Sequence, residues 1–141
     1  VLLVPMENTD VGKLRPVQTV AVYHNGETYV IATDTGDSGH GATIIEALGN
    51  LEESTPAVIY LDTAQFLLVG KDSDDVLEEL RPYFRRNVEL YSFRGDADLS
   101  AISKYLMVHG NGPQLKRWKK GEKLPVLVCS EQQIKMAKNI K

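Results

Sequence analysis

The clearest structural signal lies between residues 17 and 33, which read Val17-Gln18-Thr19-Val20-Ala21-Val22-Tyr23, His24-Asn25-Gly26-Glu27 and Thr28-Tyr29-Val30-Ile31-Ala32-Thr33. The two outer runs are rich in β-branched and aromatic residues, which are typical of strands. Asn-Gly between two such runs is a strong hairpin signal, because both central residues of a type I′ turn adopt positive φ. We predict a β-hairpin with Asn25-Gly26 at its turn.

A helix is predicted to begin at Thr43, after a loop from Asp34 to Gly41 that is rich in Gly, Asp and Ser. Thr43 and Glu46 have the spacing of a capping box. The residues that then recur at helical spacing are Ile44, Ala47, Leu48 and Leu51. Ser54-Thr55-Pro56 should close this helix.

Two further helices follow the same logic. The second opens at Asp72–Asp75, and Pro82 should end or kink it because proline lacks a backbone donor. The third starts near Asp96 and Asp98 and stops at Gly110-Asn111-Gly112-Pro113. The apolar residues expected to face inward are Val76, Leu77, Leu80 and Phe84 in the second helix and Leu99, Ile102 and Leu106 in the third.

Short apolar runs between the helices predict strands at 57–60, 65–69, 88–93 and 126–128. The predicted order is ββ-α-β-α-β-α-β. Alternating helices and apolar strands indicate an α/β (α+β) protein, with a mixed sheet opened by the hairpin and about three helices packed on it.

The composition is that of one globular domain. The chain has 141 residues, of which 43% are hydrophobic and 25% are charged, so residues 1–141 can bury a core without a disulfide or metal. We expect a core at 17–109 and a basic C-terminal extension at 113–141. Cys129 follows an apolar run and is expected to be a small buried residue. Because the chain starts at Val1 without a methionine, we expect that preceding residues were removed.

Charge is distributed unevenly. Residues 113–141 hold eight basic and two acidic residues, whereas the first 112 residues hold eight basic and 17 acidic ones. The basic segment contains the predicted interaction surface, with Trp118 as an exposed aromatic anchor among cations. Its residues are Lys116, Arg117, Trp118, Lys119 and Lys120. In the alternative interpretation, Trp118 covers the edge of the domain and the cations only solvate the loop.

No assembled catalytic triad, metal cage or phosphate loop is recognisable, so we predict a non-enzymatic protein without catalytic, cofactor-binding or metal-binding residues. A hydrolase that uses the loop from Asp34 to Gly41 is the enzyme alternative. Asp34-Thr35-Gly36 and Asp37-Ser38-Gly39 match aspartic-protease triplets, and Gly36-Asp37-Ser38-Gly39 matches the chymotrypsin nucleophile loop. Two triplets three residues apart cannot face each other as that chemistry requires, so a turn is the preferred interpretation.

Three weaker signals have structural interpretations that we prefer. His24, His40, Asp34 and Asp37 could converge on a cation, but they lack tight ligand spacing. The glycines at 36, 39 and 41 precede a helix without the lysine of a phosphate loop. His109 is expected near the end of the third helix, where its charge suits the dipole.

One stretch carries a family resemblance. It begins Gly39-His40-Gly41-Ala42-Thr43-Ile44-Ile45-Glu46-Ala47-Leu48-Gly49-Asn50-Leu51 and ends Phe66-Leu67-Leu68-Val69-Gly70-Lys71. This resembles the N-terminal domain of GerC-type spore-germination lipoproteins, the C subunits of nutrient germinant receptors, over about Val17 to Val108. The resemblance implies a hairpin, a Gly-rich loop, a Thr-capped helix and an apolar strand that ends in Gly. No cysteine lies near Val1 to carry a lipid, and the segment after Pro113 has no counterpart in the family.

The resemblance implies a non-enzymatic, exported protein-interaction domain, with an extracytoplasmic location and possible membrane association. A protein partner is expected, within a membrane receptor assembly, and a cytoplasmic location is the alternative. The third hypothesis is a binder of nucleic acid or anionic membranes that acts through the basic C-terminal extension. The net negative charge of the first 112 residues disfavours it. A domain of still other function also stays open.

Overall fold

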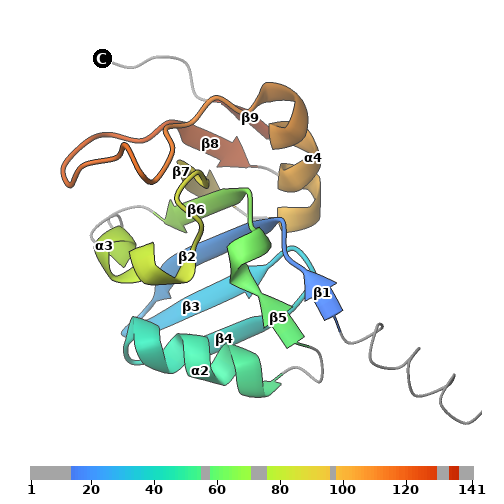
Figure 1. Cartoon of the computed structure of the whole chain (residues 1–141), viewed down its shortest axis with the longest axis vertical. Coiled ribbons are helices and arrows are strands. Elements are labelled where there is room, and N and C mark those ends of the chain that lie inside the picture. The colour runs from blue at the N-terminus through green and yellow to red at the C-terminus, as the bar shows by residue number, and fades with distance from the viewer. Residues whose placement is uncertain (1–13, 55–57, 71–75, 96–97, 130–133, 137–141) are drawn as a thin grey trace, which may run out of the picture.

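The computed structural model describes residues 14–54, 58–70, 76–95, 98–129 and 134–136. Across these residues a seven-stranded sheet has the order β4-β3-β2-β6-β7-β8-β9 (Figure 1). Strands β2, β6, β7 and β8 run parallel to one another, and β3, β4 and β9 join antiparallel. The predicted α/β class with a mixed sheet is confirmed. The predicted helix-closing residues 55 and 56, and the predicted helix-opening residues 72–75 and 96, lie outside the described residues.

The sheet strands are β2 (Thr19–Asn25), β3 (Thr28–Thr33), β4 (Ser38–Gly41), β6 (Phe66–Gly70), β7 (Glu89–Gly95), β8 (Val126–Cys129) and β9 (Ile134–Met136). A separate parallel pair consists of β1 (Leu14–Pro16) and β5 (Val58–Tyr60). The helices are α2 (Ile44–Ser54), α3 (Val76–Leu80) and α4 (Leu99–His109), with short 3₁₀ turns η1 (Leu61–Thr63) and η2 (Arg81–Tyr83).

The predicted hairpin is formed by β2 and β3, but its turn lies one residue later than expected. Asn25 pairs with Thr28, so the two-residue loop is Gly26-Glu27 rather than Asn25-Gly26. Gly26 takes φ +71°, a conformation that glycine adopts without steric cost. Glycine thus occupies the first loop position, and Asn25 belongs to the last residue pair of the two strands.

The prediction of a loop throughout residues 34–41 is wrong in its second half, because Ser38–Gly41 forms the edge strand β4. Helix α2 packs so closely on β4 that a Cβ atom at Gly39 or Gly41 would collide with the helix backbone around Leu51 and Ala47. These glycines therefore permit close strand–helix packing, a role that local sequence patterns do not reveal.

The predicted helix signals are confirmed where the structure describes them. The Glu46 amide donates to Thr43 Oγ1 at 3.1 Å, and Glu46 Oε1 accepts from the Ala42 amide at 2.6 Å. Helix α3 ends at Leu80, just before the turn that contains Pro82. Asp98 caps α4 by accepting from the Ala101 amide at 3.3 Å. All the inward-facing apolar residues predicted for the three helices are buried.

Side chains of the sheet alternate between two core layers. One layer contains Val20, Val22 and Leu67 with the apolar faces of α2 and α3, and the other contains Ala21, Leu68 and Tyr91 with α4. Figure 1 shows the orange segment between α4 and β8 extending to the side of the sheet where α3 lies. This segment adds Leu115 and Trp118 to the layer of α2 and α3.

The C-terminal part of the chain belongs to the same sheet. Strand β8 lies between β7 and β9, and Leu127 at its centre is fully buried. Cys129 is 6% exposed, which confirms that it is a small buried residue. Strand β9 was not predicted. None of the described helices is both long and apolar enough to cross a membrane.

Candidate functional site

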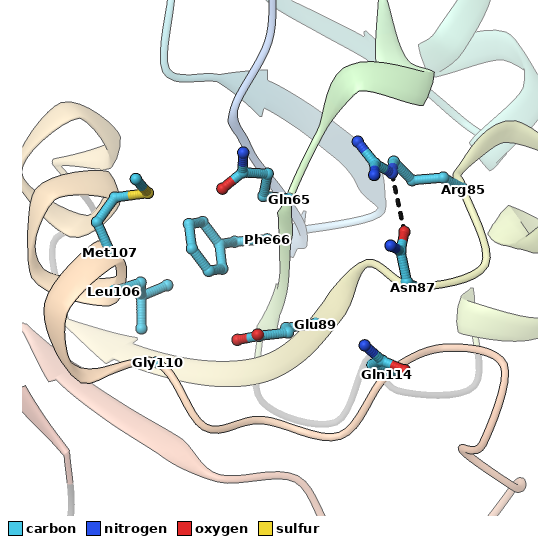
Figure 2. A pocket seen from close by; sticks show the side chains of 9 residues that line it. All are labelled: Gln65, Phe66, Arg85, Asn87, Glu89, Leu106, Met107, Gly110 and Gln114. Carbon is cyan, nitrogen blue, oxygen red and sulfur yellow. Dashed lines mark hydrogen bonds between the residues drawn. The ribbon is translucent and has the colours of Figure 1, made fainter.

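A pocket of about 390 Å³ opens where strands β6 and β7 begin and helix α4 ends (Figure 2). Its position follows from the topology, since β6 and β7 are parallel neighbours and their amino ends share one edge of the sheet. The lining residues are Gln65, Phe66, Arg85, Asn87, Glu89, Leu106, Met107, Gly110 and Gln114.

One side of the pocket is apolar. Phe66 and Leu106 are buried at 4% and 2% exposure, and Phe66 packs against Tyr91 with ring centroids 6.4 Å apart. Met107 is 59% exposed beside them, and its sulfur accepts from Gln18 Nε2 at 3.1 Å. A thioether adapts its shape to irregular apolar partners. Met107 therefore supplies most of the accessible apolar surface on this side, and an aliphatic group can pack against it.

Glu89 provides a carboxylate in a defined orientation. Tyr91 donates its hydroxyl hydrogen to Glu89 Oε1 at 2.7 Å, and the Gly112 amide donates to the Tyr91 hydroxyl at 2.8 Å. Burial raises the pKa of Tyr91 well above its usual value of about 10, and the hydrogen bond to Glu89 adds to this effect. Tyr91 therefore remains a neutral donor at neutral pH, and Figure 2 shows the Glu89 carboxylate on the side of Phe66 and Leu106.

The opposite wall is formed by amides and one guanidinium. Arg85 Nε donates to Asn87 Oδ1 at 2.8 Å, and Gln114 forms an antiparallel bridge with Glu89. Side-chain amides can both donate and accept hydrogen bonds. Together with Gln65, these groups can bind the peptide groups of an extended chain.

The prediction that Trp118 is an exposed anchor is wrong, because the ring is only 2% exposed. Arg81 lies 5.5 Å from the ring centroid and donates to the carbonyls of Leu115 at 3.0 Å and Trp118 at 2.8 Å. The indole Nε1 donates to the Glu122 carbonyl at 3.3 Å. Burial satisfies both the large apolar ring and its single donor. The alternative, in which Trp118 covers the domain edge, is confirmed.

The other predicted surface residues, Lys116, Arg117, Lys119 and Lys120, are exposed. The structure adds two exposed cations that the sequence analysis missed, since the Lys116 amide donates to the Arg86 carbonyl at 2.8 Å and brings Arg85-Arg86 alongside. We call these six residues the basic cluster. No local pattern could reveal it, because its two parts are about thirty residues apart in the chain.

Residues 34–37 form a turn that is held by hydrogen bonds to its side chains. Asp34 Oδ1 accepts from the amides of Gln18 at 3.0 Å and Thr19 at 3.3 Å. Thr35 Oγ1 donates to Asp37 Oδ2 at 2.7 Å. Gly36 has φ +93°. The preferred turn interpretation is thus confirmed for Asp34 and Asp37: the Asp37 carboxylate accepts a hydrogen bond within the turn, and that of Asp34 accepts from the backbone at the start of β2.

The histidines lie outside this turn. The ring centroids of His24 and Tyr29 are 4.0 Å apart near the hairpin loop. Asp34 follows the last residue of β3, at the other end of the hairpin. His40 lies on β4, and among the described residues no three His, Cys, Asp or Glu side chains are placed to hold a metal ion. His109 lies in the last turn of α4, as predicted, and stacks on Tyr105 at 4.6 Å.

No family model, curated protein or solved structure matches this chain. Its function is therefore inferred from the geometry of the described residues. The pocket and the basic cluster offer hydrogen-bonding groups, an apolar wall and fixed charges, which are the components of a binding surface.

Proposed function

We propose that this chain is a non-enzymatic protein-interaction domain that binds a segment of a partner protein at the pocket between α4 and the amino ends of β6 and β7. The observation that carries the proposal is the combination of a buried apolar wall and amide-bearing side chains within one open pocket. An extended peptide needs both, since its side chains require apolar contact and its backbone requires donors and acceptors.

Exposed apolar residues beside the pocket support this proposal. Met107 and Val108 at the end of α4 are 59% and 76% exposed. Large apolar groups next to a polar rim are typical of interaction surfaces. A partner that covers Met107 would lie directly beside the pocket, which Phe66 and Leu106 also line.

The resemblance to GerC-type germination proteins extends the proposal. It suggests that the domain is exported, acts extracytoplasmically and associates with a membrane receptor assembly. The features on which the resemblance rests are the hairpin, the Thr43-capped helix and the apolar strand ending in Gly70.

A photocrosslinking experiment in the source cell tests the proposal. A benzophenone amino acid replaces Met107 in one variant and Glu52, exposed on α2, in the control. We expect a discrete protein adduct from position 107 that is absent from position 52. The proposal fails if position 107 gives no adduct, or if both positions give the same adducts.

The hydrolase alternative is tested on a broad ester and peptide panel. We expect no turnover by the wild-type chain. Turnover that disappears in Asp34→Ala or Ser38→Ala, while both variants keep the wild-type melting temperature, would replace our proposal.

The exposed basic cluster favours a second candidate, a binder of nucleic acid or anionic membranes. Binding of this type weakens steeply with salt because counterions are released. Titration against DNA, RNA and phosphatidylglycerol vesicles at low salt measures it. We expect only weak, non-saturating binding, since the remainder of the chain is acidic.

A further inference from the structure

The pocket and the basic cluster are joined by two paired backbone segments, so we describe them together as one surface. Residues 114–116 run antiparallel beside residues 86–89, with the Leu115 amide donating to the Val88 carbonyl at 2.8 Å and the Lys116 amide donating to the Arg86 carbonyl at 2.8 Å. Gln114 at one end of this pairing lines the pocket, and Lys116 at the other end belongs to the cluster. Arg85 belongs to both.

The backbone that carries the cluster is fixed by the core beneath it. Trp118, which lies between Arg117 and Lys119 in the chain, is buried in the core, and Arg81 donates to the carbonyls of Leu115 and Trp118. Arg81 is itself held by Glu78 at 3.0 Å, and this contact lowers the pKa of the Glu78 carboxyl. Little backbone ordering is then needed when a partner binds, which favours affinity.

We infer that this surface binds an extended acidic segment of a partner protein, with one apolar side chain of that segment in the pocket and its carboxylates over the basic cluster. The inference rests on the proposed function and adds the chemistry of the partner. Within residues 114–123, five cations accompany a single acid, Glu122, whose carboxylate already accepts from the Lys119 amide at 2.9 Å. A partner segment rich in carboxylates is complementary to these cations.

Two features favour a peptide over other polyanions. Met107, which is 59% exposed beside Phe66 and Leu106, offers an apolar contact for an aliphatic side chain, and a nucleic-acid phosphate backbone has no such group. Glu89 would repel an anion inside the pocket, so the partner's charges belong outside it, over the cluster. This arrangement separates an apolar anchor from an acidic run along one extended segment.

Fluorescence anisotropy with defined probes tests the inference on the full chain. The main probe is a labelled peptide with one leucine next to a run of glutamates, made in both sequence orientations. Matched probes replace the leucine by serine or all glutamates by glutamine, and labelled oligothymidylate and phosphatidylglycerol vesicles form separate arms. We expect saturable binding of at least one acidic leucine peptide, and at least about tenfold weaker binding of both matched peptides.

Variants assign the binding to this surface. Lys119→Glu/Lys120→Glu and Met107→Asp should each weaken binding of the main peptide about tenfold. Arg94→Glu, an exposed charge reversal at the carboxyl end of β7, away from the pocket, should leave the Kd within about twofold. Melting temperatures equal to that of the wild type exclude unfolding as the cause.

The outcomes separate the inference from the proposed function. Equal binding of the glutamine peptide, or no binding of any peptide, overturns the acidic partner; the proposed function stands if the Met107 crosslink persists. An unchanged Kd in Met107→Asp overturns the pocket as the anchor site. If only oligothymidylate or the vesicles bind saturably, and position 107 gives no protein adduct, both the acidic partner and the proposed function are overturned.

Discussion

Trp118 anchors the loop that carries the lysines of the basic cluster, because its ring packs in the core layer of α2 and α3. Trp118→Ala should lower the free energy of unfolding by about 3–5 kcal/mol, since it removes a large buried side chain. Chemical denaturation measures this loss, and Arg117→Ala, an exposed neighbour, should change it by less than about 0.5 kcal/mol. As Trp118 is the only tryptophan, its emission should be blue-shifted and resistant to quenchers; a fully quenchable ring would contradict its burial.

Tyr91 predicts a specific dependence of stability on alkaline pH. Its pKa in the folded chain is raised by burial and by Glu89, so the unfolded chain loses this proton first as pH rises above about 10. The stability that Tyr91 contributes is therefore complete below pH 10 and is lost as pH rises further.

We expect the free energy of unfolding of the wild type to fall more steeply above pH 10 than that of Tyr91→Phe. Denaturation series at several alkaline pH values measure both slopes, and the comparison cancels the other tyrosines and the lysines. At neutral pH, Tyr91→Phe should cost about 1–3 kcal/mol, because the Gly112 amide loses its acceptor. Equal slopes of unfolding free energy against pH in the two proteins would contradict a raised pKa for Tyr91.

The pairing of strand β4 with helix α2 depends on the absence of side chains on the strand. Gly39→Ala places a methyl group against the backbone of α2, so we expect a loss of about 1–3 kcal/mol in unfolding free energy from overpacking. Gly49→Ala is the matched control, because Gly49 lies within α2 and a Cβ there meets nothing within 4 Å. It should stabilise the chain by about 0.5–1 kcal/mol through helix propensity. Equal effects of both substitutions would show that β4 and α2 are less closely packed.

The whole molecule depends on its C-terminal part, because residues after Pro113 complete both the sheet and the core. A chain that ends at Pro113 lacks Leu115, Trp118 and strand β8, and leaves one side of β7 unpaired. We expect this truncation to lose cooperative thermal unfolding, as judged by calorimetry. The full chain with Lys119→Ser/Lys120→Ser should unfold cooperatively, since it loses charge without loss of core. Cooperative unfolding of the truncated chain would mean that residues 17–109 fold alone.

The hairpin, the three helices and their buried faces were predictable from the residues because each depends on short-range chemistry. Thr43 caps its own helix, Pro82 ends one, and apolar spacing selects the inward faces of α2, α3 and α4. The class of fold follows from the order of these elements. Even the turn at Gly26 was misplaced by only one residue.

The candidate site could not be predicted in the same way, because its parts meet only after the chain folds back on itself. Gly39 becomes part of a strand by pairing with Ile31 of β3 and packs against α2, and Trp118 is buried by a core assembled from distant segments. The pairing of residues 114–116 with 86–89 brings Arg85 and Arg86 to Lys116 and places Gln114 beside Glu89. Local patterns encode caps, turns and amphipathic faces; which surfaces lie side by side depends on strand pairing and burial between residues far apart in the chain.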